Sequence, residues 1–250
     1  MKIYAVGLGP GGEEGLTGGA RRALRESDVV VGYDLYLRLI ADLVAGKELV
    51  ASGMRREEAR CRAAVEAALG GKTVSLVSSG DAGIYGMAGL LFEVAAGHPE
   101  IEIEVVPGVT AASSAAALLG APLANDFAAI SLSDILTPWQ AIESRLRLAA
   151  QADFCICLYN PASARRAGHL ARACGILMEH RAGSTLCGYA RNIGREGETW
   201  KVLSLAELAE AKVDMFTTAI VGNSTTRSIG GRLVTARGYG AGKAVRGTEA

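Results

Sequence analysis

The first residues that could do chemistry form a glycine-rich loop, GLGPGG, at positions 7–12. The loop follows a strand-like apolar run, and Asp34 follows the next one, so letters and spacing fit the fingerprint of a dinucleotide-binding fold. Pro10 has no amide hydrogen, however, and the glutamates at 13–14 place negative charge beside the loop, so a pyrophosphate would bind poorly. The next helix is expected to begin only near Thr17, too late for its first turn to hold a phosphate.

A glycine loop flanked by acids suits a neutral or positively charged ligand better than an anion. S-adenosylmethionine is such a ligand, because its sulfonium carries a positive charge. A nicotinamide-dependent oxidoreductase is the alternative from a different class. It would bind NADH and have little affinity for S-adenosylhomocysteine.

The segments that must position this loop alternate between short apolar runs and helical stretches. The apolar runs are four to seven residues long and lie at 3–8, 28–32, 73–78, 102–106, 128–132, 153–159, 184–189 and 216–221. Most are separated by segments whose apolar residues recur three and four positions apart, such as EEARCRAAVEAALGG. The alternation predicts an α/β fold with a mainly parallel sheet in the first half of the chain.

A change of composition near Gly120 divides the chain, because the glycine- and alanine-rich first half gives way to a segment with fewer helix signals. The later strand candidates at 184–190, 198–203 and 216–221 have little helix between them, which predicts antiparallel pairing and a mixed second sheet. We therefore expect two α/β domains and a flexible tail, with the bounds 1–120, 121–238 and 239–250.

Composition limits the classes of partner. Lysine plus arginine and aspartate plus glutamate each number 26, so no bulk charge favours nucleic acid or a membrane surface. The five cysteines show no CxxC pair and no histidine at zinc-ligand spacing, so no metal site is expected. The chain enters a strand-like run directly after Met1, without a basic leader, and has no apolar run long enough to span a bilayer, so we expect a cytoplasmic protein.

Seven segments, in chain order, resemble one family. The first half looks like the tetrapyrrole methylase superfamily in VGLGPGGEEGLT at 6–17, SSGDAGIYG at 78–86 and PGVTA at 107–111. The second half is similar to one branch, the precorrin-3B C17-methyltransferases of corrin synthesis, in FAAISLSDILTPW at 127–139, LYNPASARR at 158–166, YARNIGREGE at 189–198 and DMFTTAIVGNSTTR at 214–227. The chain departs from the family pattern at Ala82, where proline is common, and at Asn125, where histidine is common.

The resemblance implies S-adenosylmethionine-dependent methylation of C17 of precorrin-3B, coupled to ring contraction and giving precorrin-4 in cobalamin biosynthesis. It leaves open the cobalt-containing reaction from cobalt-factor III to cobalt-precorrin-4, methylation of another corrin position, or methylation of ribosomal RNA or a diphthamide precursor. A noncatalytic tetrapyrrole carrier would lack a cofactor pocket. The family implies a homodimer, with the cofactor in the cleft between the two domains.

The resemblance also implies site residues. Cofactor-binding residues would be Pro10, Gly80, Asp81, Ala82, Ile84, Tyr85, Thr110, Ala111, Tyr159, Asn160, Arg191, Asn192 and Thr218. The acetate and propionate groups of the substrate need arginines, which hold carboxylates in a bidentate fork, and the candidates are Arg55, Arg165, Arg191, Arg195 and Arg227. Ring contraction needs proton transfer, for which we expect Asp126 and Asp134. The three histidines, including His169, lie outside the motifs and are expected to be structural or exposed.

Overall fold

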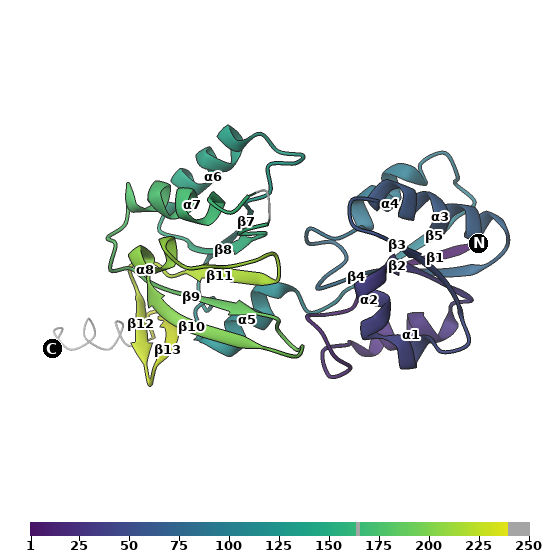
Figure 1. The fold of residues 1–250 in the computed structure, drawn as a ribbon, viewed down its shortest axis with the longest axis horizontal. Helices are drawn as coiled ribbons and strands as arrows, with labels where there is room; N and C mark the ends of the chain where they lie inside the picture. Colours follow the sequence, from purple (N-terminus) through teal and green to yellow (C-terminus); the bar gives the residue numbers. More distant parts are fainter. Residues whose placement is uncertain (164–165, 240–250) are drawn as a thin grey trace, which may run out of the picture. The chain divides into compact units, whose positions relative to one another are not determined.

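The computed structural model describes residues 1–163 and 166–239. The chain folds into two compact units (Figure 1). The first unit consists of Met1–Ala111 together with Gly194–Glu196, and the second of Ala112–Ile193 together with the described residues from Gly197 onward. Of the expected tail at 239–250, all but the first residue lies outside the described residues.

The first unit is built on a parallel sheet of five strands, as the alternation of apolar and helical segments predicted. The strands are β1 (Lys2–Gly7), β2 (Val29–Tyr33), β3 (Glu48–Ser52), β4 (Thr73–Ser78) and β5 (Glu102–Val106). They lie in the order β3-β2-β4-β1-β5, and each neighbouring pair is parallel.

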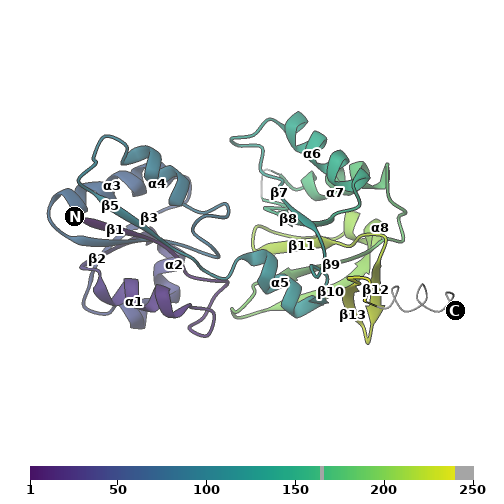
Figure 2. The same ribbon diagram turned by 180° about the vertical axis from the view of Figure 1, so that it is seen from behind.

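Helices cover both faces of this sheet. They are α1 (Gly18–Glu26), α2 (Asp34–Leu39), α3 (Glu57–Leu69) and α4 (Ala88–Val94), with a 3-10 turn, η1, at Ala41–Val44. Figures 1 and 2 show α1 and α2 on one face and α3 and α4 on the other. The reason is the alternation of side chains along each strand: Ile3 of β1 packs in the same apolar cluster as α3 and α4, and Val6 in the cluster with α1.

The helix after β1 begins late, as the sequence indicated. The side chain of Thr17 accepts a hydrogen bond of 3.1 Å from the backbone N–H of Ala20, so it caps α1 at its first turn. The glycine loop at 7–12 therefore lies outside the helix. β1 leads to α1 on one face, whereas its neighbour β4 leads to α4 on the other, and in open α/β sheets ligands bind at the carboxyl ends of two such strands.

The second unit has a mixed sheet, which confirms the expected antiparallel pairing of the later strands. Its strands are β7 (Phe127–Ser131), β8 (Cys155–Tyr159), β9 (Leu186–Arg191), β10 (Thr199–Ser204) and β11 (Thr217–Val221), in the order β10-β9-β11-β8-β7. In this sheet β7 and β8 pair in parallel, and the other neighbouring strands pair antiparallel. A smaller sheet joins β12 (Thr226–Ile229), β13 (Arg232–Thr235) and β6 (Gly120–Ala121).

The helices of the second unit are α5 (Ala111–Leu119), α6 (Trp139–Gln151), α7 (His169–Met178) and α8 (Leu205–Ala209). All but the first residue of α5 belongs to this unit, so the boundary falls between Ala111 and Ala112 rather than after residue 120. Packing explains the difference. A Cβ on Gly188 of β9 would lie 2.6 Å from a methyl of Leu119, so α5 sits directly against the second sheet.

Candidate functional site

Three glycines bring the loops after β1, β4 and β5 into direct backbone contact. A Cβ on Gly7 would lie 2.6 Å from the amide nitrogen of Gly108, and a Cβ on Gly108 would lie 2.2 Å from the carbonyl oxygen of Gly80. The loops after β1 and β4 are also joined by a bridge, in which Gly9 and Gly80 exchange hydrogen bonds of 2.9 and 2.7 Å. At Gly7 and Gly108 only glycine permits this approach, because any side chain would overlap the neighbouring backbone, whereas Gly80 is favoured by its positive φ of 67°.

Asp81 holds the loop after β4 in shape. Its Oδ1 accepts hydrogen bonds from the amides of Gly83 at 2.8 Å and Ile84 at 3.1 Å, and its Oδ2 accepts from the amide of Gly108 at 3.0 Å. The carboxylate therefore ties two loops together. It orients backbone groups around the glycines, and the buried side chain of Ala82 packs in the apolar cluster with α3 and α4.

The same loop presents apolar side chains outward. Ile84 and Tyr85 are exposed, at 44% and 54%. Tyr85 also has a positive φ of 54°, which is uncommon for a residue with a bulky side chain and is found at functional sites where the surrounding structure enforces it. Thr110 and Ala111, in the segment after β5, complete the set of first-unit residues implied by the resemblance.

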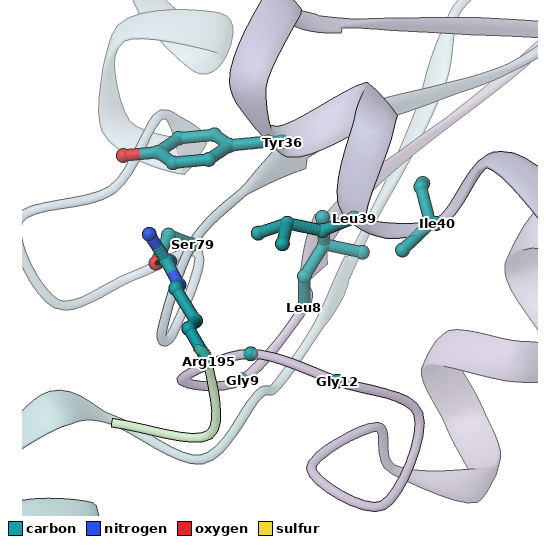
Figure 3. A pocket seen from close by; sticks show the side chains of 9 residues that line it. Leu8, Gly9, Gly12, Tyr36, Leu39, Ile40, Ser79 and Arg195 are labelled. Carbon is teal, nitrogen blue, oxygen red and sulfur yellow. Dashed lines mark hydrogen bonds between the residues drawn. The ribbon is translucent and has the colours of Figure 1, made fainter. Parts of the chain in front are cut away.

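Arg195 lies against the glycine loop of the first unit. Its Nε donates to the carbonyl oxygen of Pro10 at 3.0 Å, and an Nη donates to the Oγ of Ser79 at 3.0 Å. The guanidinium carbon is 6.0 Å from the ring centre of Tyr36. Figure 3 shows these side chains around a small cavity of about 10 Å³ that Leu8 and Gly12 also line. Burial raises the pKa of Tyr36, so its phenol stays protonated at neutral pH.

The second unit gathers most of its predicted cofactor residues at one edge of its sheet. β8 and β9 run in the same direction, because each pairs antiparallel with β11 between them. Their last residues, Tyr159 and Arg191, therefore lie at the edge where β11 begins, and Thr218 of β11 pairs with the residue before Arg191. The Tyr159 hydroxyl accepts a 3.0 Å hydrogen bond from the amide of Ala112 at the start of α5.

Two asparagines extend this edge, each in a left-handed conformation. Asn160 follows β8 with φ 52°, and its Nδ2 donates to the Oγ of Ser131 at 3.0 Å. Asn192 follows β9 with φ 52°, and its backbone N–H donates to the backbone carbonyl of Phe216 at 3.2 Å. Asparagine tolerates this conformation better than most residues. Left-handed residues at matching strand ends are typical of a site built from turns.

A pocket of about 610 Å³, a volume that suits a small-molecule ligand, borders this edge. Its lining includes Ala162, Ser163, Asp214, Met215 and Phe216. Sequence reasoning did not single out Met215 or Phe216, although both lie in the DMFTTAIVG segment used for the resemblance. Their partial exposure, at 40% and 38%, is the property that only the structure supplies. Ser79 and Tyr36 of the first unit, which contact Arg195, were likewise not singled out from the sequence.

The two aspartates expected to move protons lie at opposite ends of β7. Asp134 follows the carboxyl end of the strand, and its Oδ2 is 3.7 Å from the Nε2 of His169, whose Nδ1 is 2.9 Å from the carbonyl of Leu132. Asp126 precedes the amino end of β7, and its carbonyl accepts from the amide of Cys155. A strand of five residues separates them by roughly 16 Å. Of the two, only Asp134 follows the carboxyl end of β7, where Ser131 pairs with Tyr159.

The arginines predicted to bind substrate lie on different elements of the two units. Arg191 is at the edge described above, where its Nε donates to the carboxylate of Asp214 at 2.7 Å. Arg55 is exposed in the turn after β3, with φ 63°. Arg227 donates to the carbonyls of Ser224 and Thr226, near the amino end of β8. Arg165 lies outside the described residues.

Within residues 1–163 and 166–239, no group of three or more histidine, cysteine, aspartate or glutamate side chains is arranged to hold a metal ion. All five cysteines are buried, and burial raises the pKa of Cys61 to about 11 and of Cys157 to about 12. No helix in the described part of the chain has the length and apolar character that crossing a membrane requires.

The chain is similar to known proteins over most of its length. It matches the family of Tetrapyrrole (Corrin/Porphyrin) Methylases over residues 2–209. A Salmonella typhimurium protein described as a "Probable cobalt-factor III C(17)-methyltransferase" is 46% identical over 238 residues, which make up 95% of this chain and 99% of that protein. The crystal structure of the methyltransferase CobJ is 39% identical, with a TM-score of 0.86, over 94% of this chain and 98% of that one.

A second solved structure carries a ligand. The uroporphyrin-III C-methyl transferase from Thermus thermophilus, complexed with S-adenyl homocysteine, is 27% identical, with a TM-score of 0.71, over 89% of this chain and 97% of that one. The family match, the relatives aligned nearly end to end and the pair of α/β units agree. The chain therefore belongs to the tetrapyrrole (corrin/porphyrin) methylases.

Proposed function

We propose that this chain transfers the methyl group of S-adenosylmethionine to C17 of a corrin precursor in cobalamin biosynthesis. The observation that carries the proposal is the set of three glycine loops, tied together by Asp81 at the carboxyl ends of β1, β4 and β5. Two relatives support it: the Salmonella protein is described as a C(17)-methyltransferase, and the Thermus enzyme was solved with S-adenyl homocysteine.

Bound S-adenosylmethionine supplies an electrophilic methyl group, which an electron-rich carbon of the substrate accepts by in-line displacement. The protein then has to place the two reactants and exclude water, and it needs no nucleophile of its own. In the first unit, hydrogen bonds hold the backbone around Gly80 and Gly108 before the cofactor arrives, and Tyr85 offers an exposed apolar surface. In the second unit, the left-handed turns at Asn160 and Asn192 are our candidates for ligand contacts.

We assign the proton movement of ring contraction to Asp134. It lies next to His169 at the edge that carries Tyr159, and a carboxylate beside an imidazole is a common arrangement for proton transfer. His169 was expected to be structural, and its hydrogen-bonding contact with the carbonyl of Leu132 does fix its ring. The carbonyl oxygen of Leu132 can only accept a hydrogen bond, so Nδ1 must carry a hydrogen. In the neutral imidazole, Nε2 then carries none, and this nitrogen, which faces Asp134, can accept a proton.

Replacing Asp134 by alanine should leave the affinity for S-adenosylhomocysteine within about twofold of the native value and lower turnover by about 100-fold or more. Asp126→Ala is the matched comparison, because the same side chain is removed at the opposite end of β7. We expect this variant to keep near-native turnover. Loss of turnover in Asp126→Ala, with Asp134→Ala active, would reverse the assignment.

For the substrate we propose precorrin-3B, which would give precorrin-4. Cobalt-factor III is the second candidate, favoured by the name of the Salmonella relative. Arg191 would meet a substrate carboxylate by exchanging its partner Asp214. Incubation with each tetrapyrrole and S-adenosylmethionine, followed by mass spectrometry and NMR of the product, would show which one gains a methyl group at C17.

Calorimetric titration with S-adenosylhomocysteine and, in parallel, with NADH tests the class of enzyme. We expect micromolar binding of S-adenosylhomocysteine and no binding of NADH. The glycine loop has no N–H donor at Pro10 and lies outside α1, so it is poorly suited to a pyrophosphate. Binding of NADH alone would mean that the glycine loop at 7–12 is a dinucleotide-binding loop, as its sequence pattern suggests. If a folded chain binds neither ligand, a noncatalytic tetrapyrrole carrier is the remaining hypothesis.

A further inference from the structure

Arg195 reaches two loops that are far from it in sequence. It lies between β9 and β10, yet the segment Gly194–Glu196 packs with the first unit. A Cβ on Gly194, which has φ 67°, would be 2.6 Å from the carbonyl oxygen of Gly11. The segment therefore rests directly on the backbone of the first glycine loop, and glycine is required for that approach.

The two groups that Arg195 holds belong to different loops. Pro10 is in the loop after β1, which leads to α1, and Ser79 is in the loop after β4, which leads to α4 on the opposite face of the sheet. The backbone bridge between Gly9 and Gly80 joins the same two loops one residue away. The guanidinium thus adds a second connection beside the first. Its planar fork is suited to this task, because it donates from several nitrogens in fixed directions.

The surroundings of Arg195 hold its side chain in place. Tyr36, Leu8 and Leu39 line the same small pocket, and Figure 3 shows the arginine extended beside Ser79 and near the Tyr36 ring. A hydrogen bond from a charged donor to a carbonyl is stronger than one between neutral groups, and more so when water is kept away. The side chain is therefore engaged with the protein in a partly buried setting.

We infer that Arg195 is a positioning residue for the cofactor loops. It keeps the loops after β1 and β4 at the separation that S-adenosylmethionine requires, and it acts before any tetrapyrrole binds. This role differs from the substrate-carboxylate contact expected from sequence, and it rests on the proposed function. The two roles make opposite predictions for binding of the cofactor product alone.

The test measures S-adenosylhomocysteine binding by calorimetry, without tetrapyrrole and well below the unfolding midpoint. Arg195→Met should raise the Kd by at least about tenfold, because both charged hydrogen bonds are lost. Arg195→Lys keeps the charge but not the fork, and should fall between Met and the native residue. Arg62→Met is the control, because Arg62 is an exposed arginine of the first unit that pairs with Glu58, and it should bind normally.

A second variant and a second readout cover the case in which Arg195→Met does not fold. Ser79→Ala removes one hydroxyl and should raise the Kd by about threefold; added to Arg195→Met, it should have little further effect. Hydrogen exchange at the Gly9 and Gly80 amides should be faster in the Arg195 variants, because the adjacent connection is gone.

Native Kd and native exchange in folded Arg195→Met, with a raised KM for the tetrapyrrole, would overturn the inference in favour of substrate binding. If Arg195→Met is unfolded, native Kd in Ser79→Ala and native exchange in Arg195→Lys would overturn it. Failure of the native chain to bind S-adenosylhomocysteine would instead overturn the proposed function.

Discussion

Replacing Gly108 by alanine is expected to lower the affinity for S-adenosylhomocysteine by at least about tenfold and turnover by about 100-fold. The added Cβ would lie 2.2 Å from the carbonyl oxygen of Gly80 and 2.6 Å from the carbonyl carbon of Gly7. Both neighbours are backbone atoms, so the loop after β5 and the loops after β1 and β4 must move away from each other to accept it. We expect a cost of roughly 1–3 kcal/mol in the free energy of unfolding, measured by urea denaturation beside calorimetry.

Gly89→Ala provides the matched control. Gly89 is in α4 of the same unit, and nothing lies within 4 Å of the position that its Cβ would occupy. Alanine there should increase the free energy of unfolding by at most about 1 kcal/mol, since alanine has the higher helix propensity and Gly89 lies in the first turn of α4, and leave the ligand affinity unchanged. Equal effects of the two substitutions on affinity would show that the glycine contacts are irrelevant to the ligand.

Replacing Asp81 by alanine should also weaken S-adenosylhomocysteine binding by at least about tenfold, and should lower the free energy of unfolding by about 2 kcal/mol. The substitution removes the acceptor of three amides, those of Gly83, Ile84 and Gly108. Asp81→Asn should be only partly impaired. Its oxygen can still accept from the first two amides, but its NH₂ cannot accept from Gly108.

The control for Asp81 is Asp28→Ala, because the carboxylate of Asp28 accepts a hydrogen bond of 2.9 Å from one backbone amide, that of Thr73, the first residue of β4. We expect a modest loss of stability there and native ligand affinity. Native affinity in folded Asp81→Ala would mean that the cofactor does not depend on the loops that this carboxylate joins. Calorimetry and thermal unfolding on the same samples separate the two effects.

Sequence patterns predicted much of the fold because the relevant signals are local. Runs of four to seven apolar residues predicted most strands of the two larger sheets, although they missed β3 and the three short strands β6, β12 and β13. The late helix start near Thr17 was confirmed, because the Thr17 side chain caps α1 by accepting from the backbone N–H of Ala20. The boundary after residue 120 was placed too late, because α5 reads as another alanine-rich helix of the first half. Its packing on Gly188 depends on a strand far along the chain, which no local pattern reveals.

The cofactor residues were easier to propose than the catalytic ones for a physical reason. Glycines at strand ends, such as Gly80, mark turns and close approaches directly in the sequence. The sequence does not distinguish a catalytic aspartate from a structural one. Asp126 and Asp134 flank the same strand, β7, at opposite ends. The end that we propose for proton transfer follows from the direction of β8, β9 and β11, which is a property of the sheet.

The sequence by itself determined the α/β class, the glycine loops and the family, because periodicity and motifs are carried by residues close together in the chain. The tertiary structure alone decided what long side chains touch. Arg195 is 185 residues from Pro10 and 116 from Ser79, and only the folded chain brings the three together. Strand order fixes such contacts, and strand order depends on the packing of the whole sheet.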